Sequence, residues 1–153
     1  MLDIAAGRGR QSLCLARAGH RVVAADVSAA GLERLRQDAH LQQLSVDTVC
    51  ADLSRMLPDS LVGPWDAIVC VDYWAPSLWP SLRTSLAGPH GVLFMSLATT
   101  LNLARHARPS RRFLVDPDAG AQVVGALTPE LVSADWRASG RHELWVRAAL
   151  RIG

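Results

Sequence analysis

The sequence predicts an α/β fold, a doubly wound and mostly parallel sheet that ends in an antiparallel strand. Strand-like apolar runs alternate with helix-like segments along most of the 153 residues, which is typical of a parallel sheet flanked by helices. The last two strand-like runs, 131–136 and 143–150, are separated only by a short turn around Gly140, so they form a hairpin. A chain of this length holds one domain, which we expect to span residues 1–153.

Seven strands are expected, from apolar runs that end at turn residues or at an aspartate. They are 1–4, 21–25, 46–50, 67–71, 92–97, 131–136 and 143–150. Helix-like segments separate most of these runs. We expect helices at 11–18, after Ser28, from Pro80 to residue 86, and at 116–127.

The expected helix boundaries carry residues suited to them. Gly19 can end the first helix, and the Ser28 side chain can accept a hydrogen bond from the first turn of the second. Pro80 suits a first helical turn because proline has no N–H to donate, and Asp116 followed by Pro117 favours a helix start. The buried stripe of the second helix is expected to be Leu32, Leu35 and Ala39.

Composition and charge argue against several classes of protein. The net charge is +2 and the arginines are scattered, so no nucleic-acid partner is expected. No apolar run approaches the roughly 18–20 residues of a membrane span, and no signal peptide precedes the first motif, so we expect no membrane partner and a cytoplasmic location. Cys14, Cys50 and Cys70 are widely spaced within apolar segments, which predicts buried, reduced thiols and no metal site.

Acidic residues stand where the first four expected strands end. Asp3 and the turn 5–9 lie at the end of the first strand, Asp26 ends the second, and Asp52 and Asp72 follow the third and fourth. In an open α/β sheet a ligand binds beyond the carboxyl ends of the strands. Glycines in the turn let the backbone approach a ligand, and the helix start offers free N–H donors. Because aspartates can accept hydrogen bonds from ribose hydroxyls and an adenine amino group, the pattern predicts a nucleotide-type binding site.

Two other functions fit parts of this pattern. Asp26 lies nineteen residues after Gly7, close to the spacing of nicotinamide dehydrogenases, but Ser12 replaces their third glycine. The expected hairpin at the end of the sheet also argues against a dehydrogenase. A non-catalytic or decayed binding module is the second alternative, because the first strand is short.

Several segments resemble class I S-adenosylmethionine-dependent methyltransferases and, within that class, the tellurite-resistance-type and thiopurine-like small-molecule enzymes. The most specific segments are 2–10 (Leu-Asp-Ile-Ala-Ala-Gly-Arg-Gly-Arg), 15–20 and 23–28. Later similar segments are 50–53, 65–69, 88–93 and 140–145. The resemblance implies a Rossmann-like domain, S-adenosyl-L-methionine as cofactor, and methyl transfer to a small-molecule acceptor.

The same resemblance assigns cofactor contacts by position in the motifs. The methionine moiety would lie against Asp3 and the turn 5–9, the ribose against Asp26, and the adenine against Asp52. The full set expected to contact the cofactor is Asp3, Ala5, Gly7, Gly9, Asp26, Val27, Asp52, Leu53 and Val71.

Two departures from the family pattern bear on this assignment. Ala5 and Ala6 replace residues that are more often Gly or Cys, which is tolerable if their φ angles are negative. The chain also begins inside the first strand, where family members usually carry an upstream helix and more of that strand. We therefore expect this domain to lack both, and its cofactor binding and methylation to be weak.

Methyl transfer from a sulfonium is an in-line displacement that depends mainly on holding the reacting atoms about 3–3.5 Å apart. No catalytic dyad is needed, and no catalytic residue is assigned. If the sixth strand is parallel, the hairpin turn lies on the cofactor side and its cations predict an anionic acceptor; solvated surface charge is the alternative. Tyr73 and Trp74 either form an aromatic wall near the sulfonium or pack ordinarily. The expected substrate contacts are Arg10, Asp72, Tyr73, Trp74, Arg137, Arg141 and His142, with His106 nearby.

Overall fold

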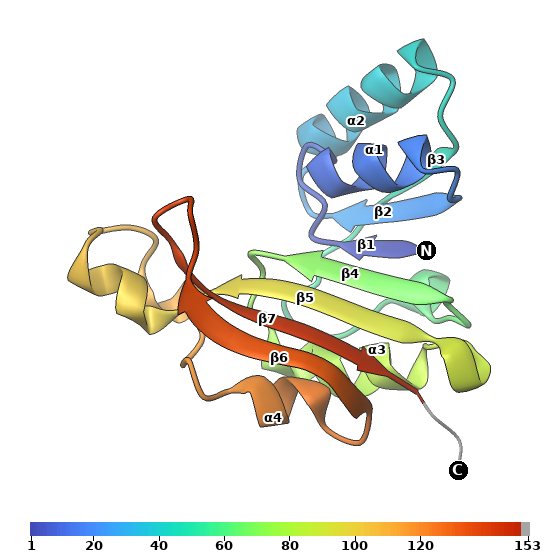
Figure 1. The fold of residues 1–153 in the computed structure, drawn as a ribbon. Helices are drawn as coiled ribbons and strands as arrows, with labels where there is room; N and C mark the ends of the chain where they lie inside the picture. The colour runs from blue at the N-terminus through green and yellow to red at the C-terminus, as the bar shows by residue number, and fades with distance from the viewer. Residues whose placement is uncertain (151–153) are drawn as a thin grey trace.

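A computed structural model describes residues 1–150 and shows a single seven-stranded sheet with helices on both faces (Figure 1). The strand order is β3-β2-β1-β4-β5-β7-β6. Six strands run in the same direction, and β7 runs opposite to them. The strands are β1 (Leu2–Ile4), β2 (Val22–Asp26), β3 (Val46–Cys50), β4 (Ala67–Val71), β5 (Val92–Ala98), β6 (Thr128–Trp136) and β7 (His142–Ala149). The expected mostly parallel sheet with an antiparallel hairpin at its end is confirmed.

The helices divide between the two faces of the sheet (Figure 1). They are α1 (Arg10–Arg17), α2 (Ala29–Leu41), α3 (Trp79–Thr84) and α4 (Gly120–Val124). On one face, α1 and α2 cover β2 and β3, and on the other, α3 and α4 cover the central strands and the hairpin. Ser28 caps α2 as expected, because its hydroxyl accepts a hydrogen bond of 3.1 Å from the Gly31 N–H. The expected α2 stripe is buried.

Two elements differ from the sequence prediction. The last helix was expected over 116–127 but spans only Gly120–Val124. A turn occupies 117–119, and Gly125 ends the helix at a φ of 57°. The sixth strand begins at Thr128, three residues earlier than expected, because it pairs along the full length of β7.

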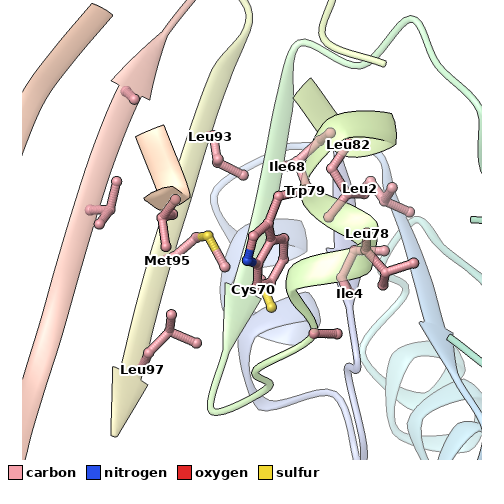
Figure 2. Close-up of a cluster of buried hydrophobic side chains, with 14 of the residues drawn as sticks. Leu2, Ile4, Ile68, Cys70, Leu78, Trp79, Leu82, Leu93, Met95 and Leu97 are labelled. Carbon is pink, nitrogen blue, oxygen red and sulfur yellow. The ribbon is translucent and has the colours of Figure 1, made fainter. Parts of the chain in front are cut away.

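The main core lies between the sheet and α3. Its largest fully buried side chain is Trp79, which packs with Leu78 and Leu82 of the same segment against β1, β4 and β5 (Figure 2). Cys70 is buried in this core, but Cys14 and Cys50 are exposed, which corrects the expectation of three buried thiols. The buried residues of α1 are Ser12 and Ala16, whereas Cys14 lines an open groove beside the helix. Cys50 ends an edge strand.

The α1 face of β4 and β5 carries no helix over its right-hand part (Figure 1). An open groove of about 750 Å³ runs there, with Val69, Val71 and Phe94 on its floor and Leu15 and Arg147 among its walls. Parallel strands are usually covered on both faces, which makes this apolar groove unusual.

The register brings the hairpin turn beside the ends of the central strands. Val71, at the end of β4, pairs with Ser96 of β5, and Ala98, at the end of β5, pairs with Glu143 of β7. Since β7 is antiparallel to both β5 and β6, β6 runs in the same direction as β5. The turn between β6 and β7 therefore lies at the carboxyl edge of the sheet, as expected.

Candidate functional site

The turn between β1 and α1 has a left-handed backbone at three positions. The φ angles of Ala5, Gly7 and Gly9 are 57°, 58° and 78°. A Cβ on Gly9 would lie 2.2 Å from a methyl of Leu35, so the turn packs on α2 too closely for any side chain there. A Cβ on Gly7 would meet no atom within 4 Å, so this part of the backbone borders open space.

Ala5 contradicts the expectation of a negative φ. A left-handed conformation brings its Cβ close to the backbone and costs about 1–2 kcal/mol relative to the ordinary regions. Its N-terminal neighbour Ile4 is paired within β1, and the N–H of Ala6 donates to the Ala25 carbonyl at 3.1 Å. The chain must turn between these two fixed points, and the sheet imposes the strained geometry on Ala5.

Asp26 ties this turn to the end of β2. One carboxylate oxygen accepts the Gly7 N–H and the other the Ser28 N–H, both at 2.8 Å. A carboxylate has about four lone-pair positions, so each oxygen keeps one for another donor. The neighbouring Val27 is 68% exposed, which leaves an apolar surface beside these free acceptor positions.

Asp3 is a buried carboxylate on the α1 face of β1. It accepts a hydrogen bond of 2.5 Å from the Ser12 hydroxyl. Burial raises the pKa of Asp3 to about 6, with a smaller contribution from Asp26. The residue lines a small pocket of about 90 Å³ at the carboxyl edge. That pocket also contacts Ala5, Ala6, Arg10, Gln11, Val71 and Asp72, so expected cofactor and substrate residues meet in it.

The expected adenine side of the site lies after β3. Asp52 is exposed and accepts the Ser54 N–H at 2.9 Å, which lowers the pKa of this aspartate, while Leu53 is buried. Tyr73 is half-buried, and its pKa is raised first by burial and then by Cys70, Asp52 and Asp26. The charges of two expected cofactor contacts therefore act on the Tyr73 phenol.

Trp74 packs against the core. Its ring centroid lies 5.8 Å from that of Trp79, at an angle of 47°. The sequence allowed Trp74 either to form an aromatic wall near the sulfonium or to pack ordinarily, and this contact is ordinary packing.

Arg141 connects the hairpin turn to the end of β4. Its Nη1 donates to Asp72 Oδ2 at 3.0 Å, and its Nη2 binds Asp72 Oδ1, so the pair is bidentate. This hydrogen-bonded contact with Asp72 raises the pKa of Arg141. Arg141 Nη1 also lies 3.6 Å from the Glu143 carboxylate. The contact joins Arg141 to Asp72, which lines the small pocket.

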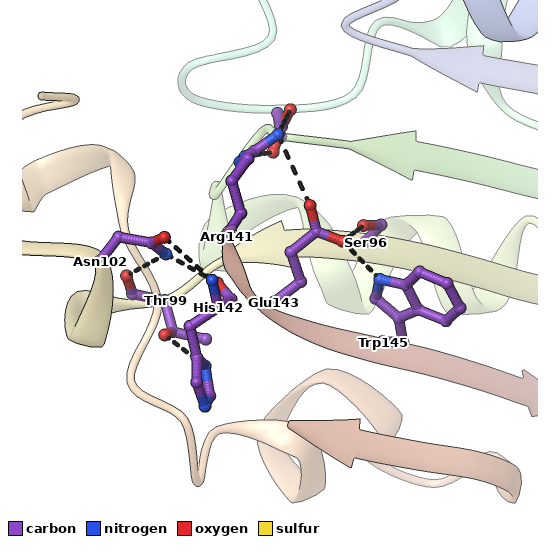
Figure 3. Close-up of polar contacts among 8 residues, drawn as sticks. Ser96, Thr99, Asn102, Arg141, His142, Glu143 and Trp145 are labelled. Carbon is purple, nitrogen blue, oxygen red and sulfur yellow. Dashed lines mark hydrogen bonds and ion pairs between the residues drawn. The ribbon is translucent and has the colours of Figure 1, made fainter. Parts of the chain in front are cut away.

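His142 does not rim the opening, which corrects its expected role. The side chain is buried, and its Nδ1 lies 2.8 Å from the Thr99 hydroxyl (Figure 3). Its ring is edge-on to that of Trp136, with the ring centroids 5.3 Å apart. Adjacent strand residues point to opposite faces, so Arg141 and His142 cannot both face the cofactor. The Arg137 guanidinium stacks on the Trp145 ring at 4.1 Å and donates to Ser133.

Two polar residues of this region were missed by the sequence analysis. Glu143 accepts a hydrogen bond of 2.7 Å from the Trp145 indole and one of 3.4 Å from the Ser96 hydroxyl (Figure 3). Asn102 exchanges three hydrogen bonds with the backbone of Thr99 and His142. Glu143 is the one acidic residue of the strand-like run 143–150, which was a signal for it. The lone asparagine of the chain offered no such signal.

The described residues also bear on metal and membrane binding. Within 1–150, no group of three or more His, Cys, Asp or Glu side chains is arranged to hold a metal ion. None of the described helices is both long and apolar enough to cross a bilayer.

Residues 1–93 match the sequence profile of a family described as a methyltransferase domain, which is more than half of the chain. This chain belongs to the methyltransferase domain family. Methyl transfer is the reaction that this family membership assigns, and the match supports neither the dehydrogenase nor the decayed-module alternative. No curated protein matches the sequence.

Solved structures resemble the methyltransferase domain at low sequence identity. TehB from Haemophilus influenzae has a TM-score of 0.78 at 15% identity; the match covers 98% of this chain and 57% of TehB. Magnesium protoporphyrin IX methyltransferase from Synechocystis, solved with S-adenosylmethionine bound, gives 0.72 at 21%, covering 99% of this chain and 69% of that one. An S-adenosylmethionine-dependent methyltransferase from Aquifex aeolicus gives 0.70 at 17%, covering 97% and 80%. At these identities the likeness shows the fold.

Proposed function

We propose that this domain binds S-adenosylmethionine along the carboxyl edge of β1 to β4 and methylates a small anionic acceptor beside the hairpin turn. Within the family we place it near the tellurite-resistance-type and thiopurine-like small-molecule enzymes, on the resemblance of segments 2–10 and 23–28. The observation that carries the proposal is the geometry of Asp26, whose carboxylate holds Gly7 and Ser28 and keeps acceptor positions beside open space.

The residues at this edge fit the parts of the cofactor. Asp26 has free lone pairs for the two ribose hydroxyls, and the exposed Val27 gives one apolar flank. The half-buried Tyr73 supplies apolar surface on the adenine side and packs on the core that contains Leu53, and Asp52 keeps a carboxylate oxygen for an amino group. When bound, S-adenosylmethionine supplies a methyl group on a positively charged sulfur.

Asp3 fits the ammonium group of the methionine moiety. A buried carboxylate whose donors are the hydroxyl and the backbone N–H of Ser12 lacks a cation to balance its charge. An ammonium group in the small pocket would provide that balance, and the turn 5–9 would approach the same moiety through its backbone. In our proposal, Asp3 therefore binds and orients the cofactor and takes no part in proton transfer.

The chain positions the acceptor and does not activate it. Asp72 is paired bidentately with Arg141, so its carboxylate is not assigned as a base. A soft acceptor atom such as sulfur is already nucleophilic, and rate then comes from alignment and exclusion of water. Arg10 and Arg141 are the cations nearest the small pocket, which supports an acceptor with negative charge.

The proposal is tested by calorimetric titration with S-adenosylhomocysteine, followed by product detection. Mercaptoacetate and 2-mercaptoethanol form a matched pair, since both offer a thiol and only the first carries a carboxylate. We expect S-adenosylhomocysteine to bind, and mercaptoacetate to be methylated faster than 2-mercaptoethanol. Absence of cofactor binding by the folded protein would disprove the cofactor assignment, and equal rates for the two thiols would disprove the anionic acceptor.

A further inference from the structure

A second pocket lies between the loop that follows β5 and the β6–β7 turn. Its volume is about 270 Å³, and its walls include Ala98, Asn102, His106, Arg108, Ser139 and Arg141. Three of these side chains can carry positive charge, and no carboxylate lines the pocket among the residues described. The volume is below the roughly 300–1,000 Å³ of a site for a whole drug-sized ligand, so it suits one charged group of a larger molecule.

The positive groups on the loop side of this pocket are not neutralised. Within the part of the chain that the structure describes, the Arg108 guanidinium and the His106 ring make no hydrogen bond or ion pair with another side chain. Arginines elsewhere on the same loop differ, because Arg105 stacks on Trp136 at 3.5 Å and Arg112 on Phe113 at 4.6 Å. Arg108 therefore presents its donors to the pocket, where an oxyanion can accept them.

Buried hydrogen bonds fix the walls of the pocket (Figure 3). The Asn102 amide donates to the Thr99 carbonyl at 2.9 Å and to the His142 carbonyl at 2.7 Å, and its oxygen accepts the His142 N–H at 2.9 Å. All three residues are almost fully buried. A buried polar cluster whose groups are satisfied is rigid, so the loop and the hairpin are held at a set separation before any ligand binds.

Arg141 connects this pocket with the one that contains Asp3, through its contact with Asp72. It lines the second pocket, while its guanidinium binds Asp72, which lines the first. The backbone also joins the two pockets, because the Asp72 N–H donates to the Ser96 carbonyl at 2.8 Å, two residues before Ala98. Arg141 and Asp72 therefore link the second pocket to the pocket in which we place the methionine moiety of the cofactor.

We propose that this pocket is the anion subsite of the acceptor, and that Arg108 and His106 determine specificity by binding the carboxylate or phosphate group of that molecule. The inference rests on the proposed function and deepens it, because it moves recognition from the hairpin cations alone to the loop after β5. Arg141 contributes the inner wall, and its pairing with Asp72 keeps it in place.

The test uses inorganic phosphate and acetate as probes. Each is titrated by calorimetry or NMR into the full chain saturated with S-adenosylhomocysteine. We expect at least one probe to bind to the wild type, and which one binds tells a phosphate acceptor from a carboxylate acceptor. Arg108→Gln should weaken that binding about tenfold, because it removes a charge-assisted bidentate donor. His106→Gln should weaken it by a smaller factor.

Arg112→Gln is the matched control. It removes the same charge from the same loop but stacks on Phe113 outside the pocket, so it should change probe affinity less than about twofold. Equal weakening by Arg108→Gln and Arg112→Gln would overturn the inference, since the overall positive charge of the loop would then account for probe binding. Absence of binding of both probes to the wild type would overturn it as well. S-adenosylhomocysteine affinity measured on the same samples separates this failure from failure of the proposed function.

Discussion

The two ends of the carboxyl edge are built in different ways. At the β1–β2 end, the contacts are made by the backbone: the Gly7 and Ser28 N–H groups donate to Asp26, and the turn has left-handed φ angles. At the β5–β7 end, side chains hold one another, as in the Arg141–Asp72 pair and the Asn102 contacts with β7. Backbone geometry constrains which residues can stand in a turn, whereas side-chain pairs can be exchanged. The difference predicts a fixed cofactor end and an acceptor end open to specialisation.

The largest expected effect is at Asp26. Asp26→Ala removes the two backbone contacts and the proposed ribose acceptors, so it should weaken S-adenosylhomocysteine binding by roughly 2–3 kcal/mol, or about 30- to 150-fold. Calorimetry on folded protein measures this. Asp47→Ala, an exposed aspartate on the neighbouring strand β3, is the control and should have little effect. Unchanged affinity in Asp26→Ala would remove the basis for a backbone-held cofactor end.

We expect the ionised Asp3 carboxylate to lower the free energy of unfolding and to strengthen cofactor binding. Its native pKa of about 6 lies above the unfolded value of 3.8, so the folded state binds this proton more tightly than the unfolded state. The contribution to the free energy of unfolding is therefore largest below pH 3.8 and falls by up to about 3 kcal/mol as the pH rises through 6. Asp3→Asn should raise stability at pH 7 by about 1–2 kcal/mol and weaken S-adenosylhomocysteine binding about tenfold.

Denaturant unfolding at pH 5 and pH 7.5 checks the stability part of this prediction. The difference between the two values should shrink in Asp3→Asn and persist in Asp47→Asn, where the aspartate is exposed. A pH dependence that survives in Asp3→Asn would show that another group causes it.

A smaller effect is expected at Ala5. Ala5→Gly relieves the left-handed strain but increases the conformational entropy of the unfolded chain. The free energy of unfolding should therefore rise by about 1 kcal/mol, or Tm by about 2–4 °C. Ala6 is the matched neighbour, because its φ is not positive. Ala6→Gly should therefore destabilise by about 0.5–1 kcal/mol. Opposite signs in the two melts would confirm that the turn itself is strained.

The smallest effect should be that of Arg141→Gln on cofactor affinity. The pair with Asp72 is more than a third exposed on both sides, so its loss should change stability by less than about 1 kcal/mol. S-adenosylhomocysteine affinity should change less than about twofold, while selectivity for mercaptoacetate over 2-mercaptoethanol falls. A large loss of cofactor affinity would show that the β5–β7 end also takes part in cofactor binding, contrary to the comparison.

The sequence predicted the fold well because the fold depends on local patterns, and the cofactor contacts assigned to the backbone-held end stay predictions. Strand boundaries follow apolar runs, and Gly7, Gly9 and Asp26 stand at intervals that a βαβ unit requires. The strain at Ala5 was missed because an alanine does not signal a positive φ. The β5–β7 end was harder, because its contacts join distant residues, such as Asp72 and Arg141 at a separation of 69 positions. His142 was misplaced because its motif match gives no information about which face it occupies.

The burial of Asp3 also has a consequence for the heat of cofactor binding. At pH 6, about half of the free molecules carry a proton on this carboxyl group. An ammonium group beside it favours the carboxylate, so in our proposal binding expels that proton into the buffer. The measured enthalpy then depends on the buffer's own ionisation enthalpy, and the slope of one against the other counts the protons released. Loading this domain with its cofactor would thus acidify its surroundings by a fraction of a proton per molecule.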